Sequence, residues 1–325
     1  MTLPIENQMG SNCPVASDLY NEKNPTEVLP ELGLVCVTSS DEVRFRTITR
    51  TRYLSLADEA RSAVLHELYR DNLRRLLGAL TFCTANNIKL YRISSGLFPM
   101  SDLAGHDTGS RILEEMQPDM AEFGSRAAQA GIRVVMHPDQ FVVINSASPQ
   151  VVENSIKTLE HHARTMDLLG LPRSAWSSMN IHGGKGGRAA ELIEALDQLP
   201  EPVKSRIALE NDEHTYGASE ILEICRTARV PMIFDVHHHV CHEGLTSLED
   251  PSIAEILAAA RATWPRPDWQ LVHLSNGRDA FADPAHHDLI TTFPSAFTQA
   301  PWIEVEAKGK EFAIRKLRAD WPEAG

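Results

Sequence analysis

The sequence predicts an α/β protein built as a (β/α)8 TIM barrel with a polar N-terminal extension. Short apolar β-type runs alternate with helix-length segments eight times, and this alternation is typical of parallel strands joined by crossover helices. The first run is followed by "VTSSDEVRF", which lacks the Gly-rich turn usual in the competing doubly wound sheet. Residues 1–30 are polar and aperiodic, so we expect a loose extension ahead of one barrel domain over 31–325.

Each element follows from its local pattern. Runs rich in apolar and β-branched residues predict strands over 32–37, 88–94, 132–137, 178–182, 206–210, 231–235, 269–275 and 302–307. Apolar residues at spacings of three and four predict helices over 59–87, 109–131, 151–170, 188–199, 218–228, 252–264, 286–299 and 309–321. Several of these segments begin with Ser or Asp, as helix N-caps do.

The composition is ordinary for a soluble globular protein, and we expect a cytoplasmic location. Of 325 residues, 42% are hydrophobic and 23% charged, and no apolar stretch approaches the roughly 20 residues that span a bilayer. The N-terminus has no basic start and apolar run, so we expect no secretory signal. Five cysteines without a C-x-x-C pair suit a reducing compartment. A net charge of −13 disfavours non-specific nucleic-acid binding, but bound metal ions would neutralise part of it.

Polar side chains gather at the carboxyl ends of the predicted strands, which converge on one face of a barrel. They are His137, His182, Glu210, Asp235 with the nearby His238, His273 and Glu306. A single histidine at a strand end is more often a hydrogen-bonded rim residue. Here six successive strands each supply a potential ligand, and charged groups in apolar runs are costly unless paired or bound to metal. The sequence therefore predicts a metal site.

The ligand types narrow the choice of metal. A set that mixes imidazole with carboxylate and lacks cysteine favours Mn, Zn, Co or Fe over copper(I), iron–sulfur clusters, Ca or Mg. Seven or eight ligands exceed the need of one ion, so we expect two or three divalent ions. Two ions about 3.5–4 Å apart suit phosphodiester cleavage.

Eight motifs in series resemble the UV damage endonucleases. In order they are "YRISSGLFP", "HPDQF", "NIHGGKGG", "LEND", "DVHHH", "VHLSNG", "HHDLI" and "VEAKGKE", and the resemblance spans residues 31–321. It implies a barrel akin to apurinic endonuclease IV that acts on double-stranded DNA. Such enzymes cut immediately 5′ to cyclobutane dimers and 6–4 photoproducts and leave a 3′-hydroxyl and a 5′-phosphate. They depend on divalent metal, typically manganese, with zinc or cobalt as alternatives here.

The resemblance also assigns residues. It implies metal ligation by His137, His182, Glu210, Asp235, His238, His273, His286 and Glu306. We expect Glu210 to bridge two ions, with His137 and His182 on one side and Asp235 and His273 on the other. Gln140 and Phe141 are implied as a wedge in the duplex at the lesion. Leu34 stands where relatives often carry an aromatic lesion contact, and Leu271 stands where some carry a lysine.

Further residues are expected to contact DNA or assist cleavage. The basic loop "VRFRTITRTRY" over 43–53 is either a phosphate-binding segment or merely a solvated loop. The predicted DNA contacts are Arg44, Arg46, Arg50, Arg92, Ser94, Ser95 and Lys185. Lys308 would stabilise the scissile phosphate, or form only a local salt bridge. Glu210 and its neighbours would position the catalytic metal ions. His237 and His239 are expected to orient a loop or meet DNA, and His242 is expected in that loop.

Two other functions stay open at this level. A sugar isomerase or epimerase of the xylose-isomerase-like group would use similar ligands on the same barrel. A lesion-binding protein without catalysis would not need eight ligands. Nothing in the sequence implies a protein partner.

Overall fold

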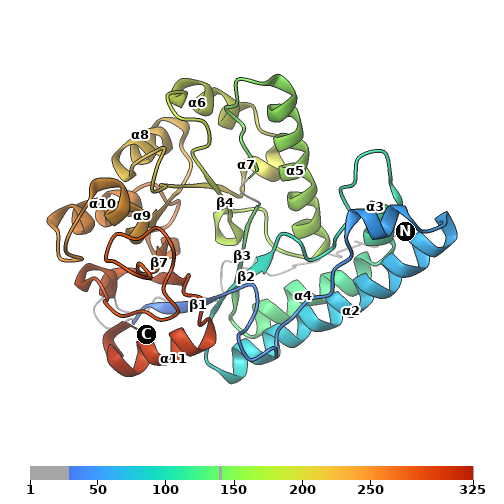
Figure 1. The fold of residues 1–325 in the computed structure, drawn as a ribbon, viewed down its shortest axis with the longest axis horizontal. Helices are drawn as coiled ribbons and strands as arrows, with labels where there is room; N and C mark the ends of the chain where they lie inside the picture. The colour runs from blue at the N-terminus through green and yellow to red at the C-terminus, as the bar shows by residue number, and fades with distance from the viewer. Residues whose placement is uncertain (1–28, 139–140, 325) are drawn as a thin grey trace, which may run out of the picture.

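Eight parallel strands close into a barrel in sequence order (Figure 1). The computed structural model describes residues 29–138 and 141–324. The strands are β1 (Glu31–Val35), β2 (Leu90–Ser94), β3 (Arg133–His137), β4 (Met179–His182), β5 (Ile207–Glu210), β6 (Met232–Asp235), β7 (Leu271–Leu274) and β8 (Trp302–Val305). The predicted TIM barrel is confirmed, and the predicted extension falls almost wholly outside the described residues.

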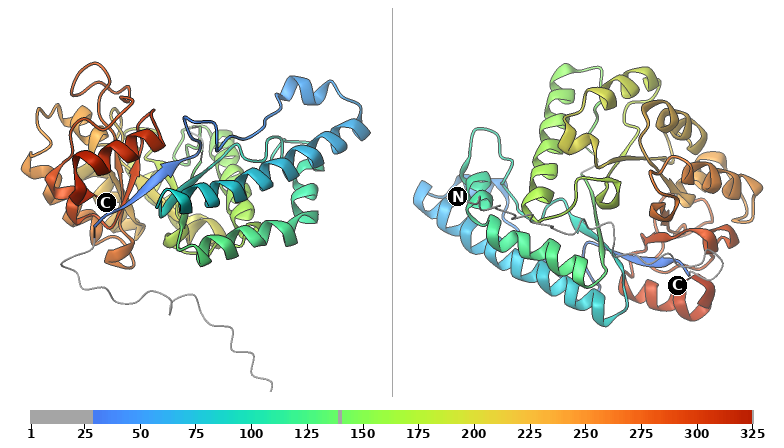
Figure 2. Two further views of the ribbon diagram at one scale, coloured as in Figure 1. Left: turned by 90° about the horizontal axis from the view of Figure 1, so that it is seen from below. Right: turned by 180° about the vertical axis from the view of Figure 1, so that it is seen from behind.

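Helices surround the barrel on its outer side. They are α1 (Arg50–Leu54), α2 (Asp58–Ala85), α3 (Thr108–Glu115), α4 (Gln117–Gln129), α5 (Pro149–Leu168), α6 (Ala189–Gln198), α7 (Glu201–Lys204), α8 (Ala218–Ala228), α9 (Val236–Glu243), α10 (Pro251–Arg261) and α11 (Glu311–Asp320). The predicted helix over 109–131 is divided into α3 and α4, because Pro118 in the first turn of α4 has no N–H to continue the ladder. The N-terminal half of α2 projects beyond the barrel and carries α1 (Figure 2). No helix of the described residues has the length and apolar character needed to cross a membrane.

The predicted helix over 286–299 is wrong. Only Ser295–Gln299 forms a short 3-10 helix, and the chain before it is irregular. The Oδ1 of Asn276 accepts the backbone N–H of Thr291 at 2.6 Å, so a side chain takes the donor that a helix would have used. Pro294 also disfavours a helical conformation at the residue before it.

The segment after β6 is helical, whereas His242 was expected in a loop. The side chain of Asp235 accepts the backbone N–H of His238 and so caps the first turn of α9. Gly244 ends the helix with a φ of 65°, the left-handed conformation typical of a helix C-terminus. Asp235 and Gly244 are typical helix-capping residues, so the sequence itself contained the signal for this helix.

The amino end of the barrel is closed by a buried arginine. Arg133, the first residue of β3, is fully buried and donates to the backbone oxygens of Trp176 (2.8 Å), Trp269 (2.8 Å) and Ala175 (3.2 Å). Its guanidinium also lies over the rings of Trp176, Trp264 and Trp302, at 4.9–5.4 Å from their centroids. This end is therefore built for stability, and chemistry is left to the opposite end.

Strand register places the site at the carboxyl end. Ser94 lies beside His137, His182 beside Glu210, and Asp235 beside His273. Because side chains alternate between the two faces of a strand, each of these strands directs its last inward-facing residue to the same mouth of the barrel.

Candidate metal centre

Seven of the eight predicted ligands come together at the carboxyl end of the barrel. They form three groups, namely His137, His182 and Glu210; then Glu210, Asp235 and His238; and then Asp235, His273 and Glu306. Within each group the ligand atoms lie within 4.8 Å of one another. Since Glu210 and Asp235 each belong to two groups, the three are continuous.

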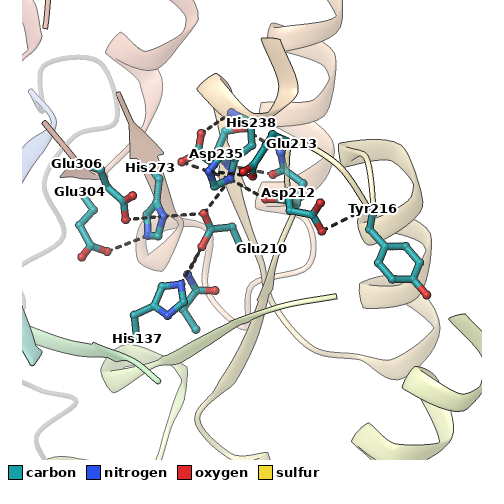
Figure 3. A network of polar contacts seen from close by, with 12 residues as sticks. His137, Glu210, Asp212, Glu213, Tyr216, Asp235, His238, His273, Glu304 and Glu306 are labelled. Carbon is teal, nitrogen blue, oxygen red and sulfur yellow. Dashed lines mark hydrogen bonds and ion pairs between the residues drawn. The ribbon is translucent and has the colours of Figure 1, made fainter. Parts of the chain in front are cut away.

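Glu210 lies at the middle of the centre and is buried (Figure 3). One carboxylate oxygen is 3.5 Å from Nε2 of His137. The other is 3.1 Å from Nδ1 of His273 and 3.3 Å from Nδ1 of His238. The amide of Asn180 on β4 donates to Glu210 and fixes its orientation.

Charges in the centre are strongly coupled. Burial alone would raise the pKa of Glu210, but His273 and His182 outweigh it and hold the pKa well below its ordinary value. Burial disfavours the protonated forms of His238 and His273, yet Asp235 beside the former and Glu210 beside the latter raise both pKa values well above the ordinary value. The carboxylates of the centre thus favour positive charge beside them, which protons on the histidines or bound metal ions would supply.

The donor set fits divalent metal ions. Oδ1 of Asp235 caps α9, whereas Oδ2 is buried and has no hydrogen-bond partner among the described residues. The buried Nδ1 of His182 is likewise without one in the described chain. Buried polar atoms are normally satisfied, so these two atoms at the mouth of the barrel fit the role of metal ligands.

Two acidic residues of the site were missed by the sequence reasoning. Glu304 is buried and contacts Nε2 of His273 at 2.8 Å and Nε of Arg92 at 2.9 Å. Glu213 lies 3.6 Å from Nε2 of His238. Alternation along β8 was the available signal for Glu304, because it faces the same side as Glu306. Glu213 sits in a loop, where no periodic pattern points to it.

Arg92 belongs to the centre itself. Its guanidinium pairs with Glu304 and, at 2.5 Å, with Glu306. The carboxylates outweigh the effect of burial and raise the pKa of Arg92. Two carboxylates already balance this charge, which argues against the predicted contact with the DNA backbone.

His286 lies beside the three groups and belongs to none of them. Its Nδ1 is 2.8 Å from the backbone oxygen of Glu306, and its ring packs 6.3 Å from that of His238. Its Nε2 is thus left for another contact, and ligation by His286 stays a prediction.

The expectation that Leu34 contacts the lesion is wrong for this structure. Leu34 is fully buried in the layer between the barrel and its helices. Alternation along β1 directs Gly33 inward, where an added Cβ would lie 2.6 Å from Leu90, and so directs Leu34 outward. It therefore presents no surface to DNA.

The predicted basic loop is partly neutralised. Arg44 pairs with Asp41, and Arg46 pairs with Glu67 at 2.9 Å. Arg50 begins α1 and is exposed, with no ion-pair partner in the described chain. Of the three arginines predicted to bind DNA in this loop, Arg50 has its charge most available. Ser94 and Ser95 are half-buried at the end of β2.

A single asparagine clamps the glycine-rich loop that carries Lys185. The side-chain amide of Asn145 donates to the backbone oxygens of Gly183 (3.1 Å) and Lys185 (2.9 Å), and its Oδ1 accepts the N–H of Lys185 at 2.8 Å. The hydroxyl of Tyr216 donates to the same oxygen of Lys185. The side chain of Lys185 is exposed on this fixed loop.

Phe141 is 79% exposed, an unusual state for a phenylalanine. The chain after it is anchored, because Val142 is buried and the N–H of Val143 donates to Ser155 at 2.9 Å. Gln140 lies outside the described residues.

Lys308, predicted to act at the scissile phosphate, is exposed near Glu306.

Known proteins resemble this chain over nearly its whole length. Residues 30–324 match the family model described as UV-endonuclease UvdE. The chain is 56% identical over 292 residues to a UV DNA damage endonuclease of Nostoc sp., and the match covers 90% of each chain. The crystal structure of SacUVDE superposes with a TM-score of 0.75 at 24% identity and covers 89% of this chain and 98% of that one. Endonuclease IV of Thermus thermophilus gives 0.53 at 13% identity, with 91% and 100% covered. The two structural likenesses bear on the fold alone.

The family follows from the length and strength of these matches. One relative exceeds half identity over nine-tenths of the chain, and the family model spans the barrel from β1 to the C-terminal turn. The chain therefore belongs to the UV-endonuclease UvdE family.

Proposed function

We propose that this protein is a metal-dependent DNA repair endonuclease that hydrolyses the phosphodiester bond immediately 5′ to UV photoproducts. Its substrates would be cyclobutane pyrimidine dimers and 6–4 photoproducts in double-stranded DNA, and its products a 3′-hydroxyl and a 5′-phosphate. The observation that supports this most is the set of three ligand groups that share Glu210 and Asp235.

The proposed ligands are the seven residues of these groups together with His286. They would hold two or three divalent ions, with manganese preferred over zinc or cobalt. When bound, such ions activate water and stabilise charge on the leaving oxygen. The protein's own part is to fix the ligands, since Glu304 and Asn180 orient His273 and Glu210.

The exposed residues near the centre would position DNA. Lys185 and Arg50 would bind backbone phosphates. Phe141 and Gln140 would enter the duplex where the lesion weakens stacking. Lys308 would stabilise charge at the scissile phosphate.

An incision assay tests the proposal directly. The protein is incubated with Mn²⁺ and an end-labelled duplex that carries one cyclobutane dimer. The expected product is a single nick immediately 5′ to the dimer, in a fragment that a polymerase extends from its 3′-hydroxyl. Failure to nick with Mn²⁺, Zn²⁺ or Co²⁺, together with isomerisation of a ketose, would support the sugar-isomerase alternative instead.

Phe141→Ala is expected to weaken binding to lesion-containing duplex by about 5- to 150-fold, because stacking of a base on an aromatic ring contributes about 1–3 kcal/mol. Affinity for undamaged duplex should change little, since Phe141 reaches a base only where stacking is broken. Fluorescence anisotropy in EDTA measures both affinities without cleavage. Phe312→Ala is the matched control, because Phe312 is 44% exposed on α11. Equal losses on both duplexes would contradict a wedge.

A further inference from the structure

A second cluster of charge lies at the rim of the metal centre. A cavity of about 340 Å³ is lined by Arg92, His286, Glu306, Lys308 and Lys310. Glu306 belongs to the third ligand group as well, so the cavity and the metal centre share a wall. The cavity therefore adjoins the place where the proposed reaction occurs.

The cations of this cavity are not equally balanced. Arg92 is paired with Glu304 and Glu306. Lys310 is half-buried, yet within residues 29–138 and 141–324 no carboxylate lies within ion-pair distance of its ammonium group. Burial lowers the pKa of Lys310. Among the described residues this half-buried cation has no direct ion pair, and beside an open cavity it is suited to receive an anion from solution.

The backbone at Lys310 is strained. Its φ of 51° and ψ of −121° match the first central position of a type II′ turn, which glycine normally occupies. A side chain there costs conformational energy, and such strain is retained where the surrounding structure over-determines it, often at functional sites.

The neighbours of Lys310 hold it in this conformation from both sides. Each carboxylate oxygen of the buried Glu311 accepts a backbone N–H at 2.8 Å, one from Ser39 and one from Ser40. Before it, Gly309 packs so closely that an added Cβ would lie 2.4 Å from the backbone oxygen of Asp288. The ammonium group is therefore presented to the cavity by a rigid segment.

We propose that Lys310, together with Lys308, forms a subsite that binds a backbone phosphate of the DNA strand next to the metal centre. The inference rests on the proposed function, since it presupposes DNA at this face. Lysine binds phosphate as a point charge, and a phosphate in the cavity would lie between the two lysines and the Glu306 side of the metal centre. The strained backbone at Lys310 thus lowers the stability of the fold somewhat but holds a lysine beside the metal centre.

The salt dependence of DNA binding tests the subsite without catalysis. Duplex affinity is measured by anisotropy in EDTA over a series of salt concentrations. For Lys310→Met we expect affinity to fall about 10- to 100-fold at low salt and the slope of log K against log salt to shrink by about 0.9, which corresponds to one lost phosphate contact. Lys316→Met is the matched control, because Lys316 lies on α11 and pairs with Asp320, and it should leave both quantities unchanged.

A neutral methylphosphonate identifies the phosphate. The methylphosphonate is placed at one position at a time around the lesion. At one phosphate near the cut it should weaken binding to the unaltered protein. At that same position it should not weaken binding to Lys310→Met any further. Equal costs in both proteins at every position would overturn the subsite.

Lys310→Gly separates binding from folding. Relief of the strained backbone should keep or raise the melting midpoint, by about 1–3 °C, while DNA affinity falls as in Lys310→Met. Unaltered DNA affinity in this variant would refute the proposal. A lack of nicking by the unsubstituted protein with every metal would instead count against the proposed function, independently of these binding results.

Discussion

Glu210→Gln is expected to reduce incision of lesion-containing DNA by about 10³-fold or more. Loss of one preorganised electrostatic contact at a reacting centre costs about 10²–10³-fold in rate, and Glu210 belongs to two of the three ligand groups. The amide keeps the size of the side chain but carries no charge to offset the histidines around it. Binding to the lesion should persist, because Glu210 is buried below the surface that DNA would meet.

Single-turnover incision and metal content measure this effect together. Inductively coupled plasma analysis of Glu210→Gln should show fewer bound ions than the unaltered protein. Glu194→Gln, on the exposed side of α6, serves as the control and should cut at the normal rate. Normal incision by Glu210→Gln would exclude the assigned role of this residue.

Arg133→Met is expected to lower the free energy of unfolding by about 3–5 kcal/mol. Three backbone oxygens that now accept from Arg133 would lose their donor, and each buried group left unsatisfied costs about 1–3 kcal/mol. Contacts with three tryptophan rings would be weakened as well. A native domain is stabilised by only about 5–15 kcal/mol, so this single change removes much of the margin.

Urea unfolding followed by tryptophan fluorescence gives the measurement. Arg126→Met is a suitable comparison, since Arg126 is exposed on α4 and pairs with the exposed Glu122, and surface pairs contribute about 0–1 kcal/mol. Arg133→Lys should be nearly as damaging as Arg133→Met, because one ammonium group cannot replace a planar fork with several donors. A loss of unfolding free energy below about 1 kcal/mol in Arg133→Met would show that the three tryptophans close this end of the barrel without the arginine.

The periodic parts of the fold were predictable from the sequence, whereas its irregular parts were not. All eight strands fall where apolar runs placed them, because burial on both faces leaves a continuous apolar signal. The segment over 286–299 has helical spacing, yet Asn276 and Pro294 override it. That outcome depends on a hydrogen bond between residues fifteen positions apart, which spacing cannot reveal.

The site was predictable where it follows strand ends. The seven grouped ligands occupy such positions or, for His238, the helix that starts from one. Leu34 was misassigned because the motif was followed without the alternation of β1, and Glu304 was missed for the same reason on β8. The conformation of Lys310 was not predictable, since it is imposed by contacts with the distant Ser39 and Ser40 through Glu311.

The clamp made by Asn145 has a mechanical consequence. Its amide holds the loop of Lys185, while its own backbone oxygen accepts from Arg188 at 2.7 Å. Only three residues separate it from the exposed ring of Phe141. Phe141, proposed to probe a base, and Lys185, proposed to bind a backbone phosphate, are thus anchored through the same residue. The distance between them would be nearly constant, and a lesion would be recognised by how far the distance between its disturbed base and the phosphate departs from that value.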